Sequence, residues 1–495
     1  MGKLLDEPLI FERGSRGRRG WPVAAAFDAG SVDPLPEELR REDDLAGLPE
    51  VSELEVLRHY LRLSQWNYSA ATTMYPLGSC TMKYNPVVNE AAARLPGFAR
   101  LHPLVPDDMA QGMLQLLAGL QSALQAVSGL DEVCLQPAAG AQGELLGMLL
   151  VRAYHVDRGD PRRRVLIPAS AHGTNPASSA LCGYTVTEVP VNDRGLLEAK
   201  AVAALMDDTV AALMVTNPST LGLFEEEIEG VADAVHARGG LVYMDGANMN
   251  ALMGVARPGD MGVDVMQFNL HKTFSTPHGG GGPGAGPVAV RRTLGEYLPV
   301  PRLVRSGDRF AWEHEAAKSV GRLHGFHGNV GILVRAFAYI ARLGGPGLVE
   351  ATRLALLNAN YVRARLRGTY HLPYDTPSMH ECVFSDRHLQ EHDVHTLDVA
   401  KRLLDYGFYA PTIYFPLVVK GALMIEPTET ETRETLDEFA DAMLAIAEEA
   451  RTDPAKVRQA PHDTRWARLD ETRAARRPVL RWRPPDAPAK QRSEN

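Results

Sequence analysis

Between about residue 104 and residue 290, short apolar runs alternate with helical patterns, and this alternation limits the fold more than any other feature. Apolar runs of this length, separated by helical segments, are typical of parallel strands whose sheet is covered on both faces. The sequence therefore predicts an α/β domain with a mainly parallel sheet. The expected helices span 108–127 and 141–154, and the expected strands span 164–167, 211–216, 240–245 and 264–269.

After about residue 301 the pattern changes to that of a smaller α+β domain. We expect helices at 331–343, 348–367 and 431–450 and strands at 381–384 and 422–425. Thr428 and Glu431 have the spacing of a capping box before the last helix. The predicted parts are an arm with an active-site loop (1–100), a large domain (101–330), a small domain (331–450) and a tail rich in Pro and Arg (451–495).

Composition excludes several classes of protein. The 495 residues carry 52 Lys+Arg against 61 Asp+Glu, so the net charge of -9 argues against nucleic-acid binding. The four cysteines form no CxxC pair, which suggests neither a zinc site nor a disulfide framework, and a reducing cytoplasm fits best. No signal peptide is evident, and no run approaches the roughly 18 apolar residues of a membrane-spanning helix. We expect no metal and no membrane association.

Three of the expected strands end in polar or charged residues, at Thr216-Asn217, at Asp245-Gly246 and at the segment Asn269 to Lys272. In an open α/β sheet the ligand crevice lies outside the carboxyl ends of the strands. We therefore expect the chemistry of the chain at this edge of the sheet.

Lys272 stands in the segment NLHKTFSTPHGGGGPG. A run of four glycines costs conformational entropy unless the backbone approaches something closely, although an exposed lysine before a flexible loop also fits. A phosphate-binding P-loop is excluded, because its lysine follows the glycines and Lys272 precedes them.

Asp245 ends an expected strand 27 residues before Lys272, where a carboxylate can bind a ribose, a metal or a protonated ring nitrogen. The pair matches a pyridoxal phosphate (PLP) site, which needs a lysine for the Schiff base and an acid beside the pyridine nitrogen. His172 follows another strand; a loop histidine is often structural, but here it can stack on a ring or move protons. Ala139, Gly140 and Ala141 begin a helix, where backbone N–H groups can bind phosphate, although tight packing also explains small residues. Together they predict the fold of fold-type I PLP-dependent enzymes, like aspartate aminotransferase.

Four motifs carry a resemblance to a known family, and it extends over nearly the whole chain. The chain resembles the P-proteins of the glycine cleavage system (glycine dehydrogenase, decarboxylating), and its length resembles subunit 2, the catalytic subunit of the split form. The motifs are YPLGSCTMKYNP (75–86), AHGTNPAS (171–178), DGANMNA (245–251) and NLHKTFSTPHGGGGPG (269–284).

The resemblance implies an oxidoreductase that decarboxylates glycine with PLP, releases CO2 and transfers the aminomethyl group to the lipoyl disulfide of H-protein. Lys272 would bind the cofactor as a Schiff base, Asp245 would hold the pyridinium charge and His172 would stack on the ring. The start of the helix at 139–141 would hold the phosphate together with His271. The implied partners are lipoylated H-protein and P-protein subunit 1, in an α2β2 heterotetramer.

Two alternatives stay open. The same residues could serve another fold-type I reaction on a small amino acid, such as transamination or β-elimination. The chain could also be a non-catalytic scaffold for a partner subunit, although a scaffold has no need of Lys272 and Asp245 at a crowded sheet edge. The loop from Tyr75 to Tyr84 is our candidate for the entrance of glycine and the lipoyl group.

Overall fold

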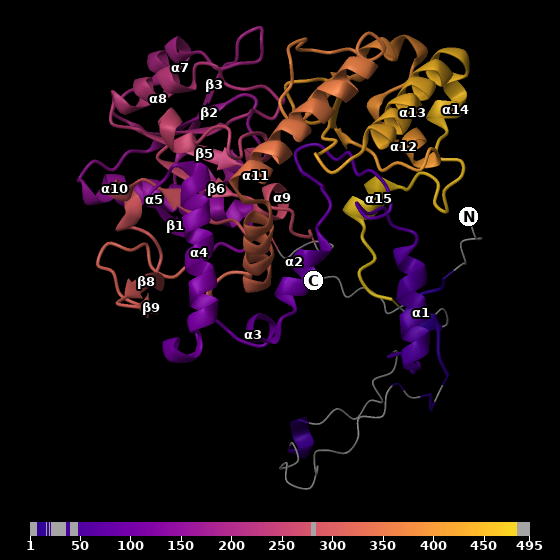
Figure 1. Cartoon of the computed structure of the whole chain (residues 1–495). Helices are drawn as coiled ribbons and strands as arrows, with labels where there is room; N and C mark the ends of the chain where they lie inside the picture. Colours follow the sequence, from indigo (N-terminus) through magenta and orange to yellow (C-terminus); the bar gives the residue numbers. More distant parts are fainter. Residues whose placement is uncertain are drawn as a thin grey trace. The chain divides into compact units, whose positions relative to one another are not determined.

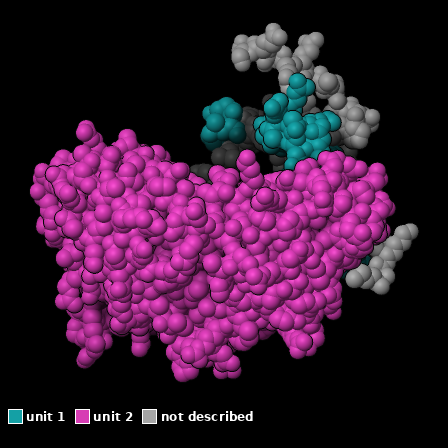
Figure 2. Space-filling view, turned by 90° about the horizontal axis from the view of Figure 1, so that it is seen from above, with its two compact units in different colours: residues 1–69, 464–495 teal, residues 70–463 magenta. Residues whose placement is uncertain are grey.

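The computed structural model describes residues 7–15, 17–18, 20, 36–39, 48–278 and 284–482. The chain forms two compact units, residues 70–463 and residues 1–69 with 464–495, which Figure 2 colours separately. The described helices of the terminal unit are η1 (Ile10–Glu12), η3 (Glu37–Leu39), α1 (Glu53–Ser64) and α15 (Glu471–Arg476). The domain limits at residues 100, 330 and 450 stay predictions.

A seven-stranded sheet forms the centre of the larger unit (Figure 1). Its strand order is β1-β7-β6-β5-β4-β2-β3, and its pairs are parallel except where β7 runs antiparallel to β1 and β6. The mainly parallel sheet that the alternation predicts is therefore present. The strands are β1 (Glu132–Cys134), β2 (Arg164–Pro168), β3 (Thr185–Val189), β4 (Val210–Thr216), β5 (Leu241–Gly246), β6 (Val265–Phe268) and β7 (Val288–Val290).

Both faces of this sheet are buried, because successive side chains of a strand point to opposite faces. Along β4, Leu213 and Val215 belong to one apolar core, whereas Ala212 and Met214 belong to another. The first core also contains side chains of α4, α8 and the first half of α11, and the second contains side chains of α5 and α10. The helices around the sheet are α4 (Gln111–Ser128), α5 (Gly140–Asp157), α6 (Thr174–Leu181), α7 (Ala199–Leu205), α8 (Ile228–His236), α9 (Leu270–Thr273) and α10 (Arg292–Gly295).

A smaller antiparallel sheet of three strands, in the order β10-β12-β11, lies in the C-terminal part of the larger unit. It packs with the end of α11 and with α12 and α13 around a third apolar core. The elements are α11 (Val330–Leu366), β10 (Cys382–Ser385), η7 (Asp386–His388), η8 (Gln390–His392), α12 (Thr396–Asp405), β11 (Thr412–Ile413), β12 (Ala422–Ile425), α13 (Arg433–Thr452) and α14 (Pro454–Arg458).

The remaining elements of the larger unit are short and lie before, within and after the part of the chain that forms the seven-stranded sheet. An antiparallel hairpin of β8 and β9 lies before α11. The other elements are α2 (Val87–Ala93), α3 (Pro96–Ala99), η4 (Asp107–Met109), η5 (Met249–Ala251), η6 (Pro258–Met261), β8 (Arg302–Ser306) and β9 (Arg309–Glu313).

The helix α11 is interrupted where the sequence predicts two separate helices. Gly344 has φ 61° and ψ -176°, a conformation that glycine adopts without steric cost, and Pro346 follows two residues later. By length and composition α11 would suffice to cross a membrane. However, side chains of both its halves lie in the apolar cores, so the structure explains its apolar character by packing.

The start of α13 differs from the prediction. Thr432 is its N-cap and accepts a hydrogen bond from the Thr435 backbone N–H at 3.3 Å. Thr428 has φ 63° and hydrogen-bonds the hydroxyl of Thr430 instead. The predicted capping box of Thr428 and Glu431 is therefore wrong, because the chain turns once more before the helix begins.

Candidate active site

Lys272 lies beyond the carboxyl end of β6, near the middle of the seven-stranded sheet. It is not the last residue of the strand, because one helical turn, α9, follows Phe268 and places Lys272 two residues into that turn. The Lys272 backbone N–H donates to the carbonyl of Asn269 at 3.0 Å. The glycine run that follows, residues 279–282, lies outside the described residues.

A cavity of about 160 Å³ opens beside Lys272. Six of the residues that the sequence singles out lie on its wall, and Ala139 is the exception. The six are Gly140, Ala141, His172, Asp245, His271 and Lys272. The carboxyl ends of β2, β4, β5 and β6 therefore converge with the beginning of α5, as expected for a parallel sheet.

The first turn of α5 forms one side of the cavity. Ala139 is the N-cap with extended backbone (φ -155°), and the helix begins at Gly140. A Cβ atom at Gly140 would overlap the side-chain oxygen of Asn269, so only glycine fits this close approach. The unpaired N–H groups of this turn and the helix dipole favour an anion such as a phosphate.

Asp245 is buried, with 3 % of its surface exposed, at the end of β5. Its Oδ1 accepts hydrogen bonds from the Ala247 N–H at 2.9 Å and from Gln267 Nε2 at 2.6 Å. Its Oδ2 accepts a hydrogen bond from Asn175 Nδ2 at 3.3 Å. Three donors thus fix the carboxylate on the cavity wall, where it can neutralise a cationic group of a ligand.

Glu144 is a second buried carboxyl group on the cavity wall, and sequence reasoning missed it. It lies one turn into α5 and accepts hydrogen bonds from Thr174 Oγ1 at 2.8 Å and Asn175 Nδ2 at 3.0 Å. Burial and the negative charge of Asp245 together raise the pKa of Glu144 to about 7, although its hydrogen bonds to Thr174 and Asn175 lower it. Near neutral pH this group therefore gains or loses a proton readily.

The two histidines of the wall are both neutral at pH 7. Partial burial lowers the pKa of His172, although Asp245 opposes this, and its Nδ1 lies 2.8 Å from Thr174 Oγ1. Burial lowers the pKa of His271 to about 4, and the charges of His278 and Lys272 add to the effect. Either imidazole can accept or donate a hydrogen bond, but neither supplies a positive charge to a ligand.

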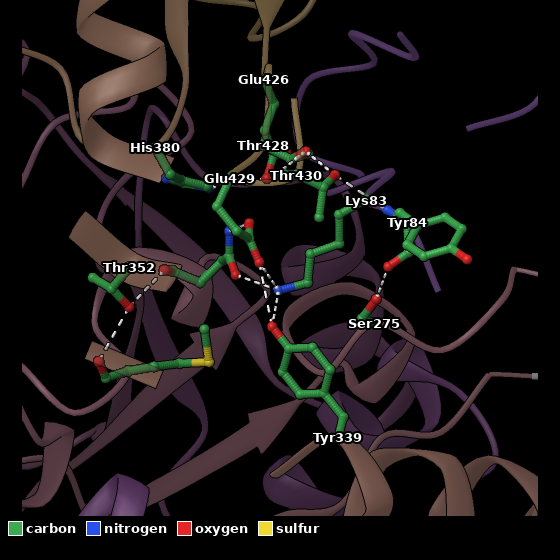
Figure 3. A network of polar contacts seen from close by, with 12 residues as sticks. Lys83, Tyr84, Ser275, Tyr339, Thr352, His380, Glu426, Thr428, Glu429 and Thr430 are labelled. Atoms are coloured by element: carbon green, nitrogen blue, oxygen red, sulfur yellow. Dashed lines mark hydrogen bonds and ion pairs between the residues drawn. The ribbon is translucent and has the colours of Figure 1, made fainter. Parts of the chain in front are cut away.

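The segment from Pro76 to Pro86, which we call the strap, reaches the cavity at Ser79. Lys83 anchors it in a buried polar network (Figure 3). The Lys83 Nζ donates hydrogen bonds to Glu429 Oε1 at 2.6 Å, Asn250 Oδ1 at 2.8 Å and the Tyr339 hydroxyl at 3.1 Å.

The charge of Lys83 is well compensated in this network. Burial lowers its pKa, but Glu429 and Tyr339 outweigh this effect, and the net pKa is raised. Ser79 places the loop on the cavity wall, but its role as an entrance stays a prediction. The structure adds a fixed anchor, Lys83, that no local pattern in the sequence reveals.

Sequence reasoning assigns no role to several further wall residues, although Asn248 and Asn269 lie within the quoted motifs. Thr216 and Asn269 stand at strand ends that the sequence marks as polar, whereas Asn248 and Thr220 come from loops. Among the described residues the buried Thr216 hydroxyl has no hydrogen-bond partner, so it is free to bind a ligand.

Comparison with known sequences identifies the family. The pattern of the family described as "Glycine cleavage system P-protein" matches residues 24–309, which is more than half of the chain. The chain belongs to this family. A second pattern, "Glycine dehydrogenase, C-terminal domain", matches residues 351–465. The sequence is 51% identical over 477 residues to a probable glycine dehydrogenase (decarboxylating) subunit 2 of Caldanaerobacter subterraneus subsp. tengcongensis, which covers 96% of this chain and 98% of the relative.

Solved structures show the same fold. A crystal structure of a glycine decarboxylase (P-protein) in inhibitor-bound form aligns with a TM-score of 0.70 at 23% identity, over 83% of this chain and 92% of that chain. The aspartate aminotransferase of Thermus thermophilus aligns with a TM-score of 0.57 at 15% identity, over 76% and 99%. At these identities the likeness shows the fold alone, and the fold-type I prediction is confirmed.

Proposed function

We propose that the chain is the catalytic subunit of a split glycine decarboxylase that uses PLP. It would release the carboxyl group of glycine as CO2 and transfer the aminomethyl group to the lipoyl disulfide of H-protein. One observation carries this proposal above the others: Lys272, Asp245, His172 and the start of α5 surround one cavity in a chain of the P-protein family.

The residues of the cavity fit PLP. The open N–H groups at Gly140 and Ala141 suit its phosphate, with His271 as a neutral hydrogen-bond partner, and Ala139 caps the same turn. Asp245 suits the protonated ring nitrogen, and His172 can lie against the ring. The unpartnered Thr216 hydroxyl offers one further polar contact. When bound, PLP supplies a sink for the electron pair that remains after loss of CO2.

The residues of the chain itself hold and orient the reacting groups. Lys272 Nζ would anchor the cofactor covalently and lies on the wall of the cavity that would hold glycine. Asp245, fixed by its three donors, keeps a proton on the ring nitrogen. Ser79 and Asn248 limit the space beside Lys272, so they favour a substrate as small as glycine.

The proposed partners are P-protein subunit 1, in an α2β2 assembly, and lipoylated H-protein; the proposed location is the cytoplasm. The relatives are named "subunit 2", which supports the existence of a first subunit. Co-purification from cells that express both chains tests the assembly. A stable and fully active monomer would refute it.

Borohydride reduction followed by peptide mapping tests the cofactor site. We expect a pyridoxyl adduct on Lys272 and none in Lys272→Ala. Carboxyl-labelled glycine should then yield labelled CO2 only when lipoylated H-protein is present. An adduct on another residue refutes the site. Other products from glycine favour a different PLP reaction. If no adduct forms even with subunit 1, the alternative of a non-catalytic scaffold subunit is favoured.

A further inference from the structure

Two buried glutamates lie side by side at the end of the small sheet. Glu381 precedes β10 and Glu426 follows β12, and the antiparallel register pairs Cys382 with Ile425, so the two glutamates extend from neighbouring positions. Both are fully buried. One oxygen of each lies within 4.8 Å of the other and of a nitrogen of His380, which is also fully buried.

The strap binds this pair with two backbone N–H groups. The Ser79 N–H donates to Glu381 Oε2 at 2.7 Å, and the Thr81 N–H donates to Glu426 Oε2 at 2.9 Å. Ser79 and Thr81 both have positive φ values, 63° and 46°. Such conformations cost of order 1–3 kcal/mol in residues other than glycine and persist where surrounding contacts impose them. The strained backbone at Ser79 and Thr81 thus directs two N–H donors to the two carboxyl groups.

The two carboxyl groups of the pair together carry fewer than two negative charges. Burial raises the pKa of Glu426 to about 7 and that of Glu381 well above its usual value, and the charge of Glu426 raises the pKa of Glu381 further. Lys272 opposes both shifts. Two carboxyl groups this close in a buried site cannot both ionise readily, so at least one of them tends to keep its proton near neutral pH.

Apart from Lys272, the titratable groups that face the pair supply no positive charge that would stabilise two ionised carboxylates. Glu429 raises the pKa of Glu426, and the half-buried Cys80 thiol faces both glutamates. Burial lowers the pKa of His380 to about 3, with Lys272 and Lys83 adding to this effect, so its ring is neutral.

Two groups at the pair have polar atoms without a partner. Among the described residues, Glu426 Oε1 and both ring nitrogens of His380 have no hydrogen-bond partner. Glu426 Oε1 lies 3.8 Å from His380 Nε2. A proton on Glu426 Oε1 would face this neutral ring, and a small shift would make it a hydrogen bond.

The pair lies directly behind the wall of the Lys272 cavity. Ser79 is part of that wall, and so is Asn248, whose Nδ2 donates to Glu381 Oε1 at 3.4 Å. The pair is thus close enough to Lys272 for their charges to interact, but it is shielded from solvent.

The proposed reaction consumes one proton in each turnover. The bond between the carboxyl carbon and the methylene carbon of glycine breaks, and the electron pair left on the methylene carbon forms a bond to one sulfur of the disulfide. The S–S bond breaks, and the second sulfur leaves with its electron pair as a thiolate. This thiolate takes up one proton to become a thiol.

We propose, resting on the function above, that Glu381 and Glu426 hold one shared proton and supply it to the reaction in the Lys272 cavity. The pair is then protonated again from water. The strap keeps both glutamates in place, and the neutral His380 ring lies beside Glu426.

Infrared spectroscopy of the purified full chain tests the shared proton without any need for turnover. The C=O stretch of a protonated carboxyl group is compared at pH 7 between the wild type and the double variant Glu381→Gln/Glu426→Gln. We expect the double variant to lose one protonated carboxyl group per chain. A loss of none or of two overturns the proposal, and so does a stoichiometric divalent cation in the purified chain, because the cation would replace the proton.

Kinetics of the assembled enzyme tests the delivery of the proton. Glu426→Gln should lower the rate of CO2 release about 100-fold to 10,000-fold and abolish the alkaline limb of the pH profile. The spectral change on glycine binding should persist. Glu426→Asp keeps an acid and should keep that limb, and the control Glu225→Gln, which alters another buried glutamate, should leave the profile unchanged.

The outcomes separate the two proposals. A Glu426→Gln enzyme with the wild-type rate and profile overturns the role of the pair, whatever the spectra show. If the wild type releases no CO2 from glycine, the proposed function fails, and the infrared comparison still decides whether the pair holds one proton.

Discussion

The buried ion pair of Lys83 and Glu429 is the sharpest test of how the strap is held. The side chain of Lys83 is fully buried and that of Glu429 is 6 % exposed. Replacement of Lys83 by Met keeps most of the volume but removes the charge and its three hydrogen bonds. Glu429 would keep contacts with Asn250 Nδ2 at 3.2 Å and with the Tyr339 hydroxyl at 3.3 Å, and neither partner carries a charge.

A buried charge without its partner is costly, and breaking such a pair typically lowers the free energy of unfolding by about 3–5 kcal/mol. We expect Lys83→Met to fall in this range in urea denaturation of the full chain. Lys83→Met/Glu429→Gln should recover much of the loss, because no lone charge stays buried. The matched control Lys318→Met removes an exposed lysine that pairs with Asp157 and Glu296, and it should have no measurable effect.

Two results would refute this reasoning. A loss below about 1 kcal/mol in Lys83→Met would mean that Glu429 finds solvent or another donor at little cost. A double variant no more stable than the single one would mean that Lys83 acts by packing and not by its charge.

Three further predictions follow from the cavity and its surroundings. Gly140→Ala places a Cβ against the Asn269 oxygen, so we expect PLP to bind about 5-fold to 150-fold more weakly in an absorbance titration, since overpacking costs about 1–3 kcal/mol. Burial raises the pKa of Glu225 from 4.5 to about 7, so this group contributes roughly 3 kcal/mol of stability below pH 4.5 that is lost as the pH rises to 7. Glu225→Gln should therefore flatten the dependence of unfolding on pH in this window, and an unchanged slope would contradict the assignment. Burial raises the pKa of the Cys80 thiol and keeps it protonated, so Cys80→Ser should leave the rate of CO2 release unchanged, and a large loss would give Cys80 a chemical role.

The sequence predicts the regular part of this fold well, because parallel strands buried on both faces leave a continuous apolar pattern. It places β2, β4, β5 and β6 within one or two residues of their observed ends. In this sheet the pattern misses β1, β3 and β7: β3 lies at an edge with mostly exposed or half-buried side chains, and β1 and β7 are too short to show any period. Strand ends also predict the site, since Asp245 and Lys272 follow neighbouring strands.

The rest of the site depends on contacts that no local pattern contains. Glu381 and Ser79 are 302 residues apart, and Lys83 and Glu429 are 346 residues apart. A glutamate beside a short apolar strand looks like an ordinary surface residue in the sequence. Only the register of β10 against β12 and the course of the strap show that these carboxyl groups are buried.

The long helix α11 has a consequence for how the larger unit loses its structure. Leu333, before the break at Gly344, belongs to the core on the seven-stranded sheet, and Leu366, at the far end, belongs to the core on the small sheet. Each core therefore uses side chains from the same continuous segment. Unfolding of either core would remove the packing contacts of one half of α11. The parts of the larger unit that contain the two cores are therefore expected to unfold together in one transition.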